Sequence, residues 1–100
     1  MSGKYMVSLR APFTSSWRKT YHESLVVALR GAWRKHNNNW SVDSISQEQK
    51  VIINSEELSQ AFAQMDDLAH NQPKRPPLEI AEQVIQEIDK AEADKDEKLN

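Results

Sequence analysis

Histidine is the most chemically versatile side chain in this sequence, and its spacing argues against a catalytic or metal site. His22, His36 and His70 are far apart, and none has a second ligand at the short spacing that metal sites use. The chain has no cysteine, which removes thiolate metal sites, disulfides and cysteine nucleophiles. No serine lies in a nucleophile elbow. We therefore expect no enzyme activity, no metal and no cofactor.

The other residues that could do chemistry lead to the same expectation. Only Gly3 and Gly31 are glycine, so a glycine-rich phosphate-binding loop cannot be built. The carboxylate pairs Glu56/Glu57 and Asp66/Asp67 are adjacent in sequence, and on a helix such neighbours point in different directions. They are typical of solvated helix faces. We expect a small protein that works by binding.

The charge of the chain is unevenly distributed. Residues 1–40 carry a net charge of +6, whereas residues 41–100 carry −8, although the whole chain has a net charge of only −2. This asymmetry indicates either two surfaces with different partners or one half that packs against the other. The longest apolar run, Leu25–Leu29, is far shorter than the roughly 20 residues that cross a membrane. We expect no membrane partner and no secretory signal.

The basic half contains the most regular apolar pattern, which predicts a long first helix over residues 16–36. Residues at helical spacing form one apolar stripe in this stretch, namely Trp17, Tyr21, Leu25, Ala28, Leu29 and Ala32. The serines and threonine before it are good N-caps, and the run Asn37–Asn39 is a good stop signal.

The opposite side of this predicted helix is the candidate partner-binding surface. Basic side chains gather there with one apolar residue, and a tryptophan lies at the border, which makes the set Lys19, Val27, Arg30, Trp33 and Arg34. Tryptophan and arginine are enriched at the residues that dominate protein–protein binding. The alternative is a small DNA-binding regulator that uses the same basic face. The acidic second half and the lack of a known DNA-binding motif count against sequence-specific DNA contacts.

The remaining elements complete the expected fold. Residues 6–10 alternate as a short strand, and residues 40–54 predict a β-hairpin, with a helical turn as the alternative. A second helix starts at Asn54 or Ser55, where Asn54 and Glu57 form a capping-box pattern, and ends near His70–Asn71. A third starts at Pro76 or Pro77 and buries Leu78, Ala81, Val84, Ile85 and Ile88.

The predicted fold class is therefore α+β and helix-dominated, with three main helices and a short strand or β-hairpin. Residues 6–88 form one small domain. Residues 1–5 read as a tag or a flexible arm, with a native N-terminus as the alternative. Residues 89–100 are mostly charged and are expected to be a disordered tail.

The connection between the last two helices is rich in proline. Three prolines lie in Gln72–Pro77, which is expected to be a rigid connector. A second interpretation gives it a function, because an X–Pro bond favours trans by only about 0.5–1 kcal/mol. Gln72, Pro73 and Lys74 would then form a loop sensitive to a host prolyl isomerase, which could stay bound at Pro73.

Two segments resemble a known family. The run Met6–Trp40 and the later Gln72–Pro77 (Gln-Pro-Lys-Arg-Pro-Pro) look like the small anti-RecBCD proteins of lambdoid phages. The resemblance covers the chain from Met6 onward. It implies a phage protein in the host bacterial cytoplasm that binds the RecBCD helicase–nuclease through its RecC subunit. By inhibiting or modifying that enzyme, such a protein protects linear phage DNA and promotes recombination.

Overall fold

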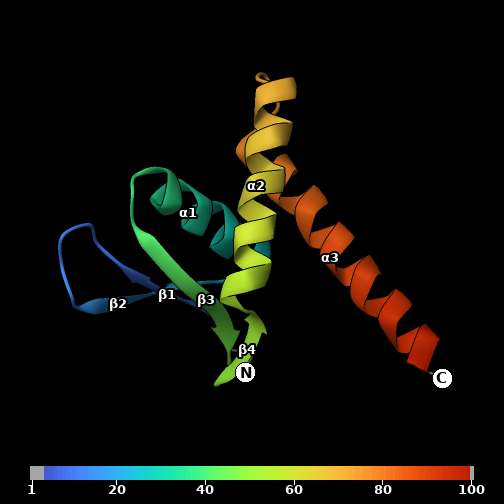
Figure 1. The fold of residues 1–100 in the computed structure, drawn as a ribbon, viewed down its shortest axis with the longest axis horizontal. Helices are drawn as coiled ribbons and strands as arrows, with labels where there is room; N and C mark the ends of the chain where they lie inside the picture. Colours follow the sequence, from blue (N-terminus) through green and yellow to red (C-terminus); the bar gives the residue numbers. More distant parts are fainter. Residues whose placement is uncertain (1–3, 100) are drawn as a thin grey trace.

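Two β-hairpins, each followed by a helix, organise the chain. The computed structural model describes the backbone of residues 4–99 and the side chains of residues 4–90. The elements, in chain order, are β1 (Tyr5–Arg10), β2 (Trp17–His22), α1 (Leu25–Asn37), β3 (Ser41–Gln47), β4 (Lys50–Ile53), α2 (Ser55–Asn71) and α3 (Pro77–Leu99) (Figure 1). The strand predicted over residues 6–10, the β-hairpin and the second and third helices are present, whereas the first predicted helix forms only over Leu25–Asn37.

The four strands form one antiparallel sheet in the order β2-β1-β3-β4. The hairpins meet through the central pair, in which Val7 lies opposite Ile45. The β3–β4 turn has Glu48 and Gln49 at φ values of 52° and 67°, as a two-residue type I′ turn requires. In Figure 1 the strands lie on the left and α3 on the right, with α2 between them.

One face of the sheet is covered by the helices, and the other is open. The core takes four buried residues from the strands and four from each helix, namely Val7, Leu9, Ile45, Ile53, Ala28, Leu29, Ala32, Trp33, Leu58, Ala61, Phe62, Met65, Ile80, Ala81, Val84 and Ile85. Strand residues that alternate with this set point away from the helices. They include Trp17, Tyr21 and Val51, which are among the most exposed large apolar side chains.

The prediction of a helix-dominated fold is wrong, because a four-stranded sheet forms a complete layer beneath the helices. The error arises within residues 16–36, where the structure has β2 and then α1 instead of one helix. Trp17 and Tyr21 are four residues apart, a spacing that puts two residues on one face of a helix and also on one face of a strand. The alternation of Trp17, Lys19 and Tyr21 is the strand signal.

The ends of the chain also differ from expectation. Tyr5, placed in the predicted arm, belongs to β1 and lies opposite His22 and Gln47, while residues 1–3 of that arm lie outside the described residues. The predicted disordered tail is wrong for the backbone, because α3 continues to Leu99. The side chains of residues 91–100 lie outside the described part of the chain.

Candidate binding surfaces

The five residues predicted to bind a partner do not share one surface. Lys19 lies in β2 opposite Ser8, on the open face of the sheet. The other four are on α1, which packs on the covered face. The single basic helix face inferred from the sequence is therefore replaced by two separate surfaces.

Helix α1 begins where a serine can cap it. Ser24 has an extended backbone, and its Oγ accepts a hydrogen bond from the Val27 backbone N–H at 3.2 Å. Basic residues fill the last turn, namely Arg34, Lys35 and His36, where they complement the negative end of the helix dipole. Lys35 places its Nζ 4.4 Å from the centre of the Trp40 ring, and His36 stacks on Phe62 with ring centres 4.7 Å apart.

The C-terminal half of α1 lines a groove that leads toward the start of α3. The groove has a volume of about 440 Å³ and is lined by Arg30, Trp33, Arg34, Asn37, Asn38 and Pro77. Three of the five predicted partner-binding residues thus meet in one concave site. We call this set the α1 groove.

Trp33 is mainly a core residue that borders the α1 groove. Its side chain is 9% exposed, and its Nε1–H donates a hydrogen bond of 2.7 Å to Oδ1 of Asp66 in α2. This bond fixes the orientation of the indole ring between two helices. Val27 is half-buried and does not line the groove.

Arg30 connects the α1 groove with His22 at the end of β2. Burial lowers the pKa of His22 from its ordinary value of 6.5, and the nearby positive charge of Arg30 lowers it further. The Nε2 of His22 lies 3.0 Å from Oγ1 of Thr20. A Cβ atom added at Gly31 would lie 3.4 Å from Cε1 of His22, so the histidine ring packs closely against α1.

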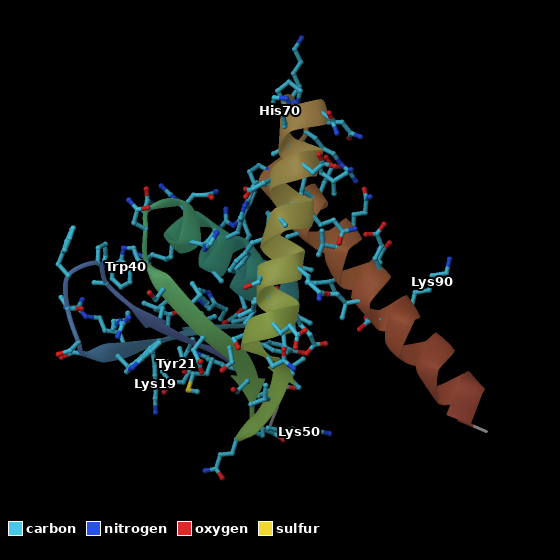
Figure 2. The ribbon with its side chains drawn as sticks, viewed as in Figure 1. Lys19, Tyr21, Trp40, Lys50, His70 and Lys90 are labelled. Atoms are coloured by element: carbon cyan, nitrogen blue, oxygen red, sulfur yellow. The ribbon has the colours of Figure 1, made fainter. Side chains whose placement is uncertain are left out.

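The open face of the sheet carries one tryptophan ring and one tyrosine ring, both of which the sequence pattern had placed in the apolar stripe of the predicted first helix. Trp17 is 52% exposed and Tyr21 is 60% exposed, with Lys19 between them on the same strand. Figure 2 shows Lys19 and Tyr21 side by side on the sheet, away from α2 and α3. The sequence signal that could have found this surface is the strand alternation, together with the absence of acidic residues before Glu23.

The β1–β2 loop adds a third exposed ring. Phe13 is fully exposed and has a φ of 66°. The left-handed conformation costs roughly 1 kcal/mol for a residue with a Cβ atom, so this backbone is held by its surroundings. Thr14 contributes to this by bonding the carbonyl of Ala11 through both its backbone N–H, at 3.3 Å, and its Oγ1, at 3.0 Å.

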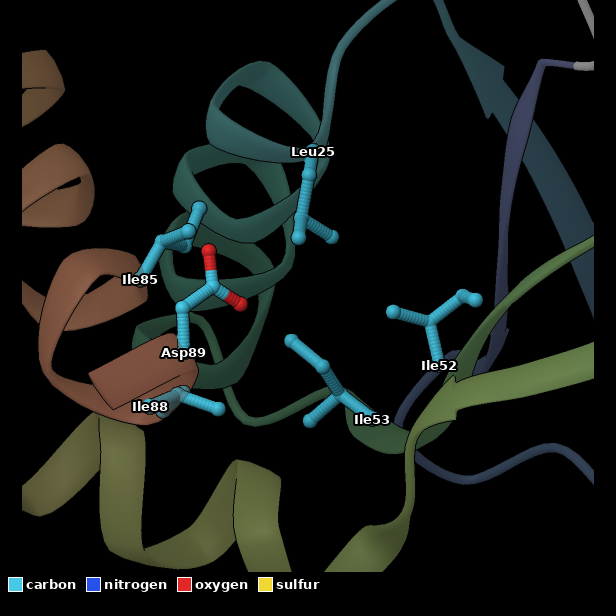
Figure 3. Close-up of a pocket in the computed structure, with 6 residues that line it drawn as sticks. All are labelled: Leu25, Ile52, Ile53, Ile85, Ile88 and Asp89. Atoms are coloured by element: carbon cyan, nitrogen blue, oxygen red, sulfur yellow. The ribbon is translucent and has the colours of Figure 1, made fainter. Parts of the chain in front are cut away.

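A small apolar pocket lies where α1, β4 and α3 meet. It is lined by Leu25, Ile52, Ile53, Ile85, Ile88 and Asp89, with the Asp89 carboxylate among aliphatic side chains (Figure 3). Its volume of about 20 Å³ is close to the space that one water molecule occupies. The pocket is therefore a packing defect rather than a ligand site.

The proline-rich connector is an exposed loop between α2 and α3. Within the described residues no peptide bond is cis, so the Gln72–Pro73 bond is trans. The backbone N–H of Gln72 bonds the carbonyl of Leu68 at 2.8 Å, and that of Arg75 bonds the carbonyl of Gln72 at 3.0 Å. Gln72, Pro73 and Lys74 are all exposed. The sensitivity of this loop to a prolyl isomerase stays a prediction.

The described residues contain no group of three or more histidine, cysteine or acidic side chains that could hold a metal ion. In the same part of the chain, no helix is long and apolar enough to cross a bilayer. Comparison with known protein families, curated proteins and solved structures finds no match to this chain.

Proposed function

We propose that this chain is a phage protein that binds the RecBCD helicase–nuclease of its host through the RecC subunit. By inhibiting or modifying that enzyme, it would protect linear phage DNA and promote recombination in the host cytoplasm. The resemblance of Met6–Trp40 and Gln72–Pro77 to the anti-RecBCD proteins supports the choice of partner. In the same proposal, a host prolyl isomerase would bind the exposed loop at Pro73.

The α1 groove is the observation that carries the choice of binding site. Arg30 and Arg34 are one helical turn apart and line the same concavity, beside the edge of Trp33. Asp66 holds the indole ring of Trp33 in place, so this wall of the groove is ordered before binding. An ordered tryptophan beside arginine side chains in a concave site is typical of the residues that dominate protein interfaces.

The groove also indicates the chemistry of the partner surface. Two guanidinium groups favour carboxylates, which they can bind with paired hydrogen bonds. We expect RecC to insert an acidic segment between Arg30 and Arg34 and to pack an apolar side chain against Trp33. The alternative of a DNA-binding first helix is less well supported, because Lys19 belongs to β2 and not to the helix.

A binding measurement with purified RecBCD tests the proposal. The double variant Arg30→Glu/Arg34→Glu should bind immobilised RecBCD at least about tenfold more weakly, because two charge-assisted contacts become repulsive. It should also lose its effect on nuclease activity on linear duplex DNA. The matched control is Lys50→Glu/Lys90→Glu, which makes the same change in charge at two exposed sites outside the groove (Figure 2).

The control variant should bind RecBCD as the parent does. Both double variants should retain the circular dichroism spectrum. The control should melt within a few degrees of the parent, since exposed charges contribute little to stability. The groove variant should melt at a lower temperature than the control but stay folded at about 25 °C, because Arg30 is half-buried and Arg34 lies at the negative end of the α1 dipole. Parent-like binding by the groove variant would place the interface elsewhere. A parent that does not bind RecBCD at all would remove the proposed partner.

A further inference from the structure

The open face of the sheet displays aromatic rings in a regular array. Trp17 and Tyr21 are on the same face of β2 and are separated by four residues, which corresponds to about 13 Å along a strand. β2 is an edge strand of the sheet, so one side of this array is accessible. Both rings are more than half exposed, which is a large amount of apolar surface to leave in water.

Basic side chains surround these rings. The first acidic residue of the chain is Glu23, so β1, β2 and their loop carry only positive formal charges. Arg10 and Lys19 lie on the face of the rings, beside Lys4, whereas Arg18 lies opposite the core residue Leu9 and points to the covered face. Lys19 lies between the two rings, and the guanidinium of Arg10 lies 5.2 Å from the centre of the Trp17 ring. Each exposed ring therefore has a cation close to it.

The open face of the neighbouring strands β1 and β3 carries small polar side chains beside the rings. Ser8 of β1 lies opposite Lys19 on one side and Ser44 on the other. Ser46 of β3 lies opposite Met6. Beside Tyr21 the surface is hollowed by about 360 Å³, in a site lined by Lys4, Met6, Lys19, Tyr21, Ser46, Glu48 and Gln49. Glu48, in the β3–β4 turn, is the acidic residue of that lining, and Asp43 of β3 accepts a hydrogen bond from the Ser44 hydroxyl.

We propose that this face binds single-stranded nucleic acid. Two bases stack on Trp17 and Tyr21, while Lys19, which lies between the rings, pairs with a phosphate of the intervening nucleotides. Arg10 lies across from Trp17 and over one face of its ring, so the base stacks on the other face and Arg10 pairs with a phosphate beside that ring. Flat rings interleaved with cations are the pattern that single strands require, because every base has an aromatic face and every nucleotide has a phosphate. Paired bases in a duplex are already stacked and cannot reach the rings. This face is separate from the α1 groove, so the inference goes beyond the proposed function.

Fluorescence anisotropy of labelled oligonucleotides tests the inference. The probes are oligothymidylate and oligouridylate of about 12 nucleotides, within the range that one small sheet domain covers, and a duplex of equal length. The parent should bind both single strands and prefer them to the duplex. A preference between the two single-stranded probes shows whether the 2′-hydroxyl contributes.

Variants of the two rings separate stacking from general charge attraction. Trp17→Ala/Tyr21→Ala should weaken single-strand binding by at least about tenfold, and Trp17→Phe/Tyr21→Phe should restore most of it. Val51→Ala, which removes exposed apolar surface from the same face without removing a ring, should bind as the parent does. Lys19→Ala should lower the slope of log K against log salt by about 0.7.

Three results would overturn the inference. The first is an absence of single-strand binding by the parent at low salt. The second is equal binding by the double alanine variant with a parent-like circular dichroism spectrum. The third is a double alanine variant that loses RecBCD binding while the parent binds no oligonucleotide, which would make the face a protein interface. Arg30→Glu/Arg34→Glu should retain oligonucleotide binding, so failure of the groove proposal and failure of this one are distinguishable.

Discussion

The pKa of His22 depends on residues of α1 that the sequence pattern does not place beside it. Its ring lies against Gly31 of α1, near the positive charge of Arg30, and its Nε2 contacts Oγ1 of Thr20. Burial and the nearby cation both disfavour the protonated ring, so the pKa of His22 lies below 6.5 in the folded protein. The unfolded chain removes both effects.

This difference in pKa predicts that stability falls on acidification. Below pH 6.5 the unfolded state binds a proton at His22 more readily than the folded state does, so protonation favours unfolding. The contribution is fully present above the unfolded pKa and is lost as the pH falls from about 6.5 toward the folded pKa. Urea unfolding of the parent and of His22→Gln, measured from about pH 7 to pH 5.5, should show a smaller pH dependence for the variant.

An NMR titration of His22 provides an independent measurement. A His22 ring that titrates at or above 6.5 in the folded protein would contradict the assignment.

At the scale of elements, α3 shows that a helical apolar pattern does not determine which residues at the borders of its stripe are buried. The apolar pattern predicted that Leu78 is buried with Ala81, Val84, Ile85 and Ile88, but Leu78 is 42% exposed. The structure instead buries Ile80, which is 1% exposed and was not in the predicted set. Leu78 and Ile80 lie on opposite borders of the same apolar stripe. Only the positions of α1 and α2 decide which border is covered.

Alanine substitutions at these two positions measure the difference. Ile80→Ala should lower the free energy of unfolding by about 2–5 kcal/mol, because it removes buried methylene groups and leaves a cavity. Leu78→Ala should change it by less than about 1 kcal/mol, because its side chain is already partly in water. Chemical denaturation of both variants gives the comparison. Equal losses would show that the N-terminal turn of α3 packs differently.

At the scale of the whole molecule, one core joins every layer. The sheet and the three helices each contribute four of the buried apolar residues, and these form a single cluster. A hydrogen bond from Trp33 of α1 to Asp66 of α2, and another from Gln64 of α2 to Glu87 of α3, connect the helices across the surface. No layer has a core of its own.

This shared core predicts cooperative unfolding. Far-ultraviolet circular dichroism and tryptophan fluorescence should give coincident urea unfolding curves, because neither the sheet nor a helix can bury its apolar face alone. Trp33 reports on the core, whereas circular dichroism reports on all helices together. Separate transitions for the two signals would indicate that α3 unfolds before the rest.

The local sequence determined those elements whose boundaries carry their own chemical signals. Asn54 and Glu57 form the predicted capping box, with bonds of 2.8 Å and 3.1 Å, and α2 begins at Ser55 as expected. The β-hairpin over residues 40–54 and the start of α3 at Pro77 follow in the same way from β-branched runs and proline. Such signals act between residues a few positions apart, so they can be recognised in the sequence alone.

The tertiary structure alone decided the state of residues 17–22 and the grouping of the candidate binding residues. Trp17 and Tyr21 satisfy both the helical and the strand period, and pairing of β2 with β1, whose partners lie 7 to 17 residues earlier in the chain, selects the strand. That choice moved Lys19 to the open sheet face and left Arg30, Trp33 and Arg34 in the α1 groove. Residues of one sequence segment separate onto two surfaces because a sheet has two faces and helices cover only one of them.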